Sequence, residues 1–484
     1  MTSKRGDIVA VVLILCLMFS LPGRADEATA TLPEPRGQSV DTDDSTLHQI
    51  NELTDQIVMQ EIELQKLNTL FRIESVHQPK LRPWRQFLYS ETNSNLTEAG
   101  LIGRMALSYP YMTENSGRPN QSAVQRCAAV SMVGQFFAAT GESFELLTNL
   151  RNGLKAQEKG LDAKTYRKKV AAKTEELDIL IDKRDQLINS ARLNETDLKI
   201  VDAETLLLKD VRDLALVQYG QYHSSAKKLR FFQNAAYLIS ISRNLVGATS
   251  NMLNIEASRR GDTNISGHAS LLNLIAGALV VATPVFGRVS GNLAGLVDRR
   301  IVSKDYAHAQ ARETATFVRD RLRFTEALDG LQASTALVQE QVKRSRIYSR
   351  QEALLVAQEA NIKRARKQGK STAIENVVTG TVVGSSRMAA GILGMIGAWK
   401  YSDAPWMSSR YTAAAATAYG AGTAFNSLET ARVRFQEEMR NRQYERKGLL
   451  PQQILQQRLA TLDAMEQSLK NEKMASVKSN SLIK

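Results

Sequence analysis

Proline is scarce over most of this chain, and its scarcity limits what the chain can fold into. Between Pro119 and Pro451 only Pro284 and Pro405 interrupt the sequence. Proline within a helix removes a backbone hydrogen bond and clashes with the preceding turn, so long stretches without it permit very long helices. Strict alternation of apolar and polar residues, which is typical of half-buried strands, does not persist in the sequence. The sequence therefore predicts an all-α protein.

Charged segments of the chain carry apolar residues at steps of three and four. In residues 151–230, Leu177 and Leu187 share one helix face, the pattern breaks near Asn194, and it resumes at Leu207. This spacing is typical of helices that pair along an apolar seam. We therefore expect long antiparallel helices or coiled coils from these segments.

Three apolar blocks rich in alanine and glycine lie between the charged segments and share short sequence features. Each block carries one matching arginine and one matching threonine. The repeat-equivalent residues are Arg104, Arg243, Arg387, Thr140, Thr283 and Thr423. The arginines and the threonines recur with the same spacing, which predicts a three-fold internal repeat of about 140 residues. We expect each unit to be an apolar helical hairpin followed by charged helical arms.

This pattern divides the whole chain into segments. The expected segments are a signal peptide at 1–25, a disordered leader at 26–46, an N-terminal coiled-coil helix at 47–76, apolar hairpins at 85–150, 231–300 and 371–430, charged helical arms at 151–230, 301–370 and 431–476, and a disordered tail at 477–484.

The first residues of the chain have the pattern of an export signal. Lys4 and Arg5 precede an apolar run at residues 8–21, which is followed by small residues suited to a signal-peptidase site. We predict cleavage after Ala25. The run of about 14 residues is shorter than the roughly 20 that a membrane-spanning helix needs, which favours cleavage over an uncleaved anchor. We therefore expect export through the secretory pathway to the periplasm or the extracellular space, with the mature chain either free or associated with a membrane.

Cysteine usage and charge narrow the expected chemistry of the exported chain. Only Cys127 remains after cleavage, so the fold must rest on packing rather than on disulfides. Its apolar neighbours favour a buried thiol, with an intermolecular disulfide as the alternative. The formal net charge of +13 falls to +11 when the signal peptide is removed. A basic exported protein can contact an anionic membrane surface, and the lack of nucleic-acid-binding motifs means that no nucleic acid partner is expected.

Catalytic and cofactor motifs are not found in the sequence. The five histidines are scattered without metal-ligand spacing, and the glycines lie within or beside apolar helices rather than in phosphate-binding loops. We therefore expect no catalytic residues, no cofactor and no metal site, and we predict that the chain is not an enzyme.

Glycines at helical spacing predict a close-packed seam between helices. The seam residues are Gly287, Gly291, Gly295, Gly380, Gly384 and Gly391. Glycines on one face let two helix backbones approach closely. The repeated arginines allow two interpretations. They either form a matched ring that binds an acidic ligand, or they pair with glutamates and extend their charged ends to the surface.

Two functions agree with this organisation. The first is an exported, non-enzymatic structural or interaction protein of the cell envelope, in which the arms bind a protein partner or self-associate and the hairpins form a soluble core. The alternative is a membrane-active protein whose apolar hairpins insert into lipid, as a pore or an anchor. Its plan resembles that of the helical pore-forming toxins, which keep an apolar hairpin within a bundle of long helices. The candidate spans are residues 271–286 and 377–399, although Arg387 near the middle of the second argues against insertion.

Overall fold

The computed structural model describes residues 44–76, 81–113, 119–158, 160, 162–191, 193–305, 314–329 and 336–482. They belong to one compact unit, Thr42–Lys484. All regular structure in these ranges is helical, which confirms the predicted all-α class for the described part of the chain. The predicted signal peptide at 1–25 and most of the predicted leader lie outside the described residues.

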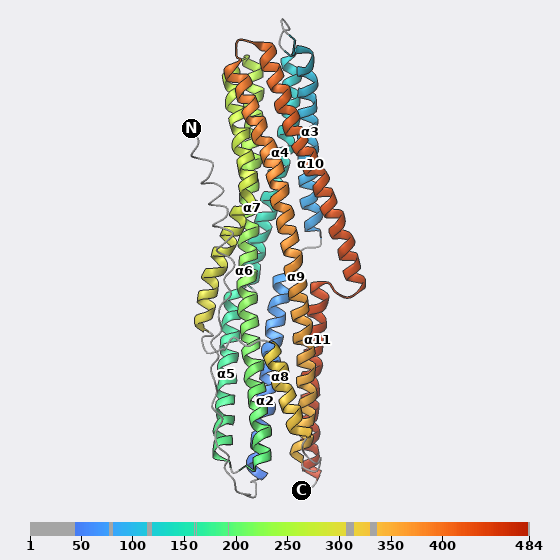
Figure 1. Cartoon of the computed structure of the whole chain (residues 1–484). Helices are drawn as coiled ribbons and strands as arrows, with labels where there is room; N and C mark the ends of the chain where they lie inside the picture. Colours follow the sequence, from blue (N-terminus) through green and yellow to red (C-terminus); the bar gives the residue numbers. More distant parts are fainter. Residues whose placement is uncertain are drawn as a thin grey trace, which may run out of the picture. The chain divides into compact units, whose positions relative to one another are not determined.

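Long helices follow one another through short connections (Figure 1). The elements are α2 (Asp44–Val76), α3 (Arg82–Ser108), the 3-10 turn η1 (Tyr109–Tyr111), α4 (Gln121–Glu158), α5 (Ala163–Ser190), α6 (Glu195–Arg260), α7 (Thr263–Asp305), α8 (Thr314–Asp329), α9 (Ala336–Met395), the π-turn η2 (Ile396–Lys400), α10 (Pro405–Arg446) and α11 (Pro451–Leu482).

Local chemistry accounts for several helix ends. The side chain of Asp162 accepts the N–H groups of Lys164 and Thr165 and caps α5. Asn194 caps α6 in the same way, at the break that the sequence pattern predicts. At the other end of α6, Gly261 takes the left-handed conformation with φ 68°, which glycine adopts without steric cost. These signals set where the backbone turns, whatever the composition of the helix before them.

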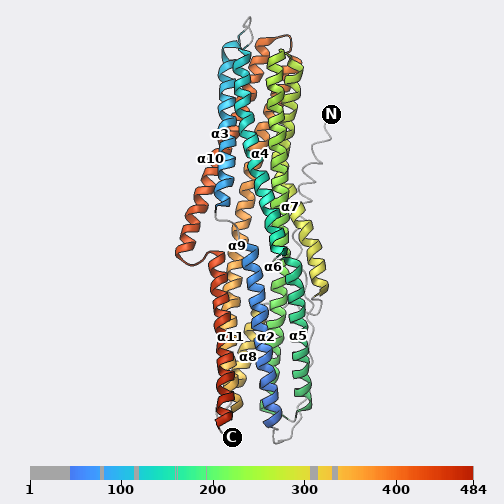
Figure 2. The ribbon, with the colours of Figure 1, turned by 180° about the vertical axis from the view of Figure 1, so that it is seen from behind.

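Six helical segments pack around a closed ring (Figures 1 and 2). Neighbours touch in the order α3, α4, α6, α7, α9, α10, and α10 returns to α3. We call these segments the ring. The ring consists of α3, α4, residues 229–260 of α6, 263–298 of α7, 369–400 of α9 and η2, and 405–437 of α10.

The remaining segments form a second helical region, which we call the bundle. It consists of α2, α5, residues 195–224 of α6, α8, residues 336–358 of α9, and α11. A large apolar core draws on all six segments and includes Ile57, Leu177, Leu207, Phe324, Tyr348 and Leu462, each less than 1% exposed. Because α6 and α9 run through both regions, the ring and the bundle share two continuous helices (Figure 1).

Several boundaries that we expected between apolar hairpins and charged arms fall inside continuous helices. Helix α6 passes through the expected boundary at 230 and 231, α9 through that at 370 and 371, and α10 through that at 430 and 431. Likewise, α11 continues to Leu482, past the expected start of a disordered tail at 477. A change from charged to apolar residues alters what a helix packs against but removes no backbone hydrogen bond. Composition alone therefore does not end a helix.

A buried polar layer crosses the bundle core. Glu204 of α6 accepts hydrogen bonds from Arg344 Nε at 2.7 Å and from Arg184 Nη2 at 3.3 Å, and the hydroxyl of Tyr348 donates to it at 3.2 Å. Arg184 Nε also donates to Thr54 of α2 at 2.7 Å. The layer joins α2, α5, α6 and α9. Because a shifted register would leave its charges unpaired in the core, the layer favours one alignment of the four helices.

Glu61 of α2 provides a test of the bundle by pH. It is 1% exposed, and neither carboxylate oxygen has a hydrogen-bond partner among the described residues. Burial raises its pKa well above the usual value. A carboxyl with a raised folded-state pKa stabilises the fold at low pH, and this contribution is lost as pH rises through that pKa.

We therefore predict that Glu61→Gln raises the urea midpoint of unfolding at pH 8, and that the gain shrinks as pH falls toward 4.5. The matched control is Glu52→Gln, because Glu52 lies on the same helix with an exposed side chain. A gain at Glu61 that did not change with pH would contradict the buried, charged carboxylate.

Candidate functional site: a six-helix ring with a polar interior

The outer surface of the ring carries large apolar side chains on all six helices. Each of them is more than a third exposed, and Leu428 reaches 74%. We call this surface the apolar belt. It comprises Leu88, Ile102, Val130, Val133, Phe144, Leu147, Leu150, Phe231, Leu238, Leu245, Met252, Leu271, Ile275, Val285, Phe286, Val289, Leu293, Ile374, Val378, Val382, Ile392, Phe425, Leu428 and Phe435. Exposed apolar surface on this scale marks contact with a partner or a membrane.

The buried apolar residues of the ring are small in comparison. Its one apolar cluster consists of Leu101, Ala390, Ala416 and Tyr419, whereas the bundle core holds leucine, isoleucine and phenylalanine from every segment. Most other buried apolar residues of the ring are alanines, such as Ala248 and Ala276. Burial of alanine removes little apolar surface from water. The ring therefore lacks the core that would hold a water-soluble bundle together.

Polar side chains occupy much of the ring interior instead. Gln135, Asn244 and Asn251 are 1, 1 and 6% exposed. Asn251 Nδ2 donates to Gln135 Oε1 at 3.2 Å, which links α6 to α4. Glu142 of α4 accepts from Asn244 Nδ2 at 3.1 Å. The ring has polar groups inside and large apolar groups outside. This arrangement is the reverse of that in a soluble protein.

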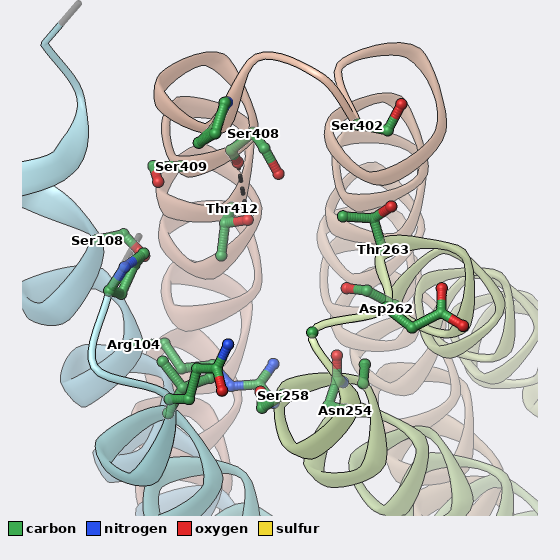
Figure 3. A pocket seen from close by; sticks show the side chains of 17 residues that line it. Arg104, Ser108, Asn254, Ser258, Asp262, Thr263, Ser402, Ser408, Ser409 and Thr412 are labelled. Carbon is green, nitrogen blue, oxygen red and sulfur yellow. Dashed lines mark hydrogen bonds between the residues drawn. The ribbon is translucent and has the colours of Figure 1, made fainter. Parts of the chain in front are cut away.

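Two cavities lie within the ring. The larger, of about 840 Å³, opens among all the ring helices except α4. Its lining combines charged and amide side chains, including Arg243, Arg387, Asn93, Asn376 and Asn426, with apolar ones such as Phe87, Phe232 and Val280. The smaller, of about 170 Å³, lies where the three hairpins turn, and we call it the tip cavity (Figure 3). The polar interior is therefore hollow on both sides of the apolar cluster at Leu101 and Tyr419.

The structure separates the three arginines that the sequence groups together. Arg243 and Arg387 line the larger cavity, whereas Arg104 lines the tip cavity. Arg387 Nη2 donates to Asn273 Oδ1 at 3.3 Å, and its guanidinium lies 5.0 Å from the centre of the Tyr419 ring. Arg243 Nη2 lies 4.0 Å from a carboxylate oxygen of Glu142. The arginines thus do not form one matched ring around a single ligand site.

The three threonines occupy different surroundings. Thr140, Thr283 and Thr423 each lie near the midpoint of their helix, in α4, α7 and α10 respectively. Thr283 and Thr423 line the larger cavity, while Thr140 is exposed. Their similar positions along the helices are therefore not matched by similar contacts.

The first glycine group lies at the contact between α6 and α7. A β-carbon built at Gly287 would lie 2.7 Å from the ring of Phe232, and one at Gly291 would lie 3.1 Å from the carbonyl oxygen of Lys228. At Gly295 the nearest atom of Lys228 would be 3.6 Å away, an ordinary contact. The approach of the two helices is thus tightest at Gly287 and relaxes toward Gly295.

The second glycine group lies between α9 and α7. A β-carbon at Gly384 would lie 2.8 Å from the carbonyl oxygen of Gly277, and one at Gly391 would lie 2.7 Å from the backbone nitrogen of Leu274. At Gly380 the nearest atom, of Pro284, would be 3.4 Å away. Because the nearest atoms at Gly384 and Gly391 include backbone, a side chain there would force the two helices apart.

Aromatic residues surround the hairpin turns. Trp399 donates its indole N–H to Asn264 Oδ1 at 3.1 Å, and the rings of Tyr401 and Tyr411 stack with centroids 5.2 Å apart. Trp399 nevertheless remains 44% exposed. Nearby, Cys127 is half-buried beside Gly103 rather than fully buried as its neighbours in sequence suggested. The hairpin turns therefore combine packed and exposed aromatic surface.

Sequence reasoning did not assign a role to the interior amides. Gln135, Asn251 and Asn273 are isolated polar residues within apolar helices. In the sequence, serine, threonine and asparagine are scattered through the hairpins. Because the side of each helix that faces the interior was not known, this scatter argued against membrane insertion. In the part of the chain that the structure describes, no group of three or more histidine, cysteine or acidic residues is arranged to hold a metal ion.

Among the described residues, two helices are long and apolar enough to cross a membrane by length and composition. They are Thr263–Asp298 in α7 and Glu340–Lys400 in α9 with η2, and only 22 and 33% of their most apolar stretches are buried. Comparison with known proteins adds no relative, because no protein-family profile, curated protein or solved structure matches this chain.

The glycine contacts between α7 and α9 lead to a prediction about stability. We expect Gly384→Ala to destabilise the protein by about 1–3 kcal/mol, because the added methyl group overlaps the backbone of α7. Gly369→Ala is the matched control on the same helix, since nothing lies within 4 Å of the added carbon. It should stabilise the protein by up to about 1 kcal/mol through helix propensity.

Thermal unfolding followed by circular dichroism measures both effects. Equal stabilisation by the two alanines would show that α7 and α9 do not approach closely at Gly384.

Proposed function

We propose that the chain is an exported, non-enzymatic, membrane-active protein whose ring inserts into a lipid bilayer and forms a polar-lined pore, while the bundle remains in water. The carrying observation is the reversed ring, with its apolar belt outside and amides, arginines and alanines inside. A lipid bilayer solvates the belt, and the closed ring shelters the polar groups from lipid. A membrane anchor alone would need no polar interior, so the interior favours a pore.

The length of the apolar belt supports this proposal. On α4, α6, α7 and α9 the belt begins at a similar distance from the hairpin turns, at Val130, Met252, Leu271 and Ile392. On the same helices the last belt residues are Leu150, Phe231, Leu293 and Ile374. Exposed Leu154, Leu229, Leu296 and Val297 extend the apolar surface of α4, α6 and α7 by about one turn or less beyond them. Each stretch covers roughly 20 residues of helix, which span about 30 Å at about 1.5 Å per residue. That length matches the hydrocarbon core of a bilayer.

Basic side chains lie at the edge of the belt nearest the bundle. These residues are all exposed and lie beside the last belt residues of their helices. We call them the basic collar, and they are Arg151, Lys155, Lys228, Arg230, Lys367 and Arg432. At that level they would meet phosphate head groups, and anionic lipids attract such side chains by about 1 kcal/mol each. The collar supports the expected anionic membrane surface as a partner.

The bundle supplies the second part of the proposal, a coiled-coil arm outside the membrane. On α9 the buried residues Gln341, Arg344, Tyr348, Gln351 and Leu355 recur at steps of three and four, as in a coiled-coil seam. We propose that exposed faces of these helices bind a protein partner or a second copy of the chain. The three hairpins follow one another around the ring, as a three-fold repeat of about 140 residues would produce. Cleavage after Ala25 would place the mature chain in the periplasm or outside the cell.

Matched aspartates on one helix test membrane insertion. Val382 lies in the belt and is 41% exposed, and Val356 lies in the bundle portion of the same helix and is 50% exposed. We predict that Val382→Asp raises the lipid concentration needed for half-maximal vesicle binding by about 70- to 400-fold, since a charge at bilayer depth costs about 2.5–3.5 kcal/mol. Val356→Asp should bind as the wild type does. Vesicle flotation measures both.

Release of an encapsulated dye from anionic vesicles provides the second measurement. The wild-type chain and Val356→Asp should release the dye, and Val382→Asp should not. Equal binding by the two variants, or vesicle binding by the wild type without release, would contradict an inserted pore.

A further inference from the structure

The tip cavity contains a guanidinium to which the described residues supply no partner at two of its nitrogen atoms. Arg104 of α3 lines this cavity, and its Nε and Nη2 atoms are buried without a hydrogen-bond partner among the described residues. Burying an unpaired charge is costly. A guanidinium kept in this state is therefore poised for an anion that is not part of the chain.

Several hydroxyl-bearing residues line the same cavity as this arginine. Figure 3 shows the side chain of Arg104 crossing the floor of the cavity toward Ser258 of α6. Ser108, Ser409 and Thr412 line the cavity from α3 and α10. Each of the three hairpins therefore contributes hydrogen-bonding groups to one small space.

From this geometry we propose that the tip cavity binds a phosphate ester, with its phosphate group on Arg104 and the surrounding serines. A guanidinium binds phosphate oxygens through two parallel N–H bonds, and hydroxyls can donate to the remaining oxygens. The volume of about 170 Å³ holds roughly six waters at about 30 Å³ each. It suits a phosphate with a small substituent.

Asp262 indicates which chemical group the substituent of the phosphate carries. It also lines the cavity, and its Oδ1 accepts the backbone N–H of Asn264 at 2.8 Å. A second anionic group would be repelled by this carboxylate, whereas a hydroxyl or ammonium group could donate to it. The site therefore favours an ester such as glycerol phosphate over inorganic phosphate. Such an ester could be a soluble molecule or the head group of a lipid.

In the larger cavity Arg243, Arg387 and Arg434 each have at least one partner, although the Nε atoms of Arg387 and Arg434 are also buried without one. Arg434 lies 3.8 Å from Glu437 and 3.7 Å from Glu438, and Arg243 lies near Glu142. The phosphate-ester proposal also differs from the pore proposal in its requirements. Binding of a soluble phosphate ester there does not depend on entry of the ring into lipid.

The test is calorimetric titration of the purified full-length chain with glycerol 1-phosphate. We expect Arg104→Met to weaken binding about tenfold or more, because charge-assisted hydrogen bonds to the phosphate are lost. Arg126→Met is the matched control, since Arg126 is an exposed arginine on α4 whose Nε donates to the carbonyl oxygen of Ser122. It should change the affinity by less than about twofold. Ser409→Ala, from the opposite hairpin, should weaken binding without removing a charge.

A competition experiment distinguishes the two sources of ligand. If the ligand is a lipid head group, glycerol 1-phosphate should reduce binding of the chain to phosphatidylglycerol vesicles, and Arg104→Met should remove that competition. If the ligand is soluble, glycerol 1-phosphate should bind without affecting vesicle binding. Failure of the wild type to bind glycerol 1-phosphate would overturn the proposal, as would equal binding by Arg104→Met, and neither result would bear on pore formation.

Discussion

The rest of this structure depends on one constraint, which is the solvent that surrounds the ring. In water, folding is driven by burial of apolar surface, and the bundle satisfies this requirement with a core of large aliphatic and aromatic residues. The ring does the opposite, because its largest apolar side chains face outward and its interior holds amides and arginines. Such an arrangement would expose extensive apolar surface to water, but it matches a bilayer. If the ring enters lipid as proposed, one chain contains two regions whose stability rests on different surroundings, joined through the continuous helices α6 and α9.

The contacts that hold each region together differ accordingly. For a ring inserted in lipid, as proposed, there is no gain from burying one apolar helix against another, so close backbone approach and polar contacts would have to stabilise it. Close backbone approach occurs between Gly384 and Gly277 and between Gly391 and Leu274. A polar contact is made by the hydrogen bond between Asn251 and Gln135. In the bundle, apolar burial supplies the stability, and the layer around Glu204 fixes the alignment of the helices. The boundary between the two regions lies near the basic collar, where a membrane surface would lie.

The sequence predicted the helical class and the break near Asn194 because these follow from local chemistry. Proline and helix caps act within a few residues of themselves, as the Asn194 cap and Gly261 of the structure do. Apolar residues at steps of three and four similarly placed Leu177 and Leu207 on faces that the structure buries.

The direction in which each hairpin face points could not be predicted, since it depends on all six helices closing into one ring. For the same reason the sequence assigned no role to Asn251 and Asn273, although Asn251 bonds to Gln135 and Asn273 accepts from Arg387. Arg104 was singled out by its repeat position, but its separation from Arg243 and Arg387 is a property of the assembled hairpins.

The most direct test of the central claim is the solvent around single nitroxide labels on α7, measured by electron paramagnetic resonance in anionic vesicles. Labels would replace Ile275, Val285 and Leu293 one at a time in a chain whose Cys127 is serine, with a label at exposed Leu206 in the bundle as the reference. Collisions with oxygen should exceed collisions with a water-soluble nickel complex at the three ring positions, and the order should reverse at Leu206. Water-like accessibility at all four positions would show that the ring does not enter lipid, and would contradict this account.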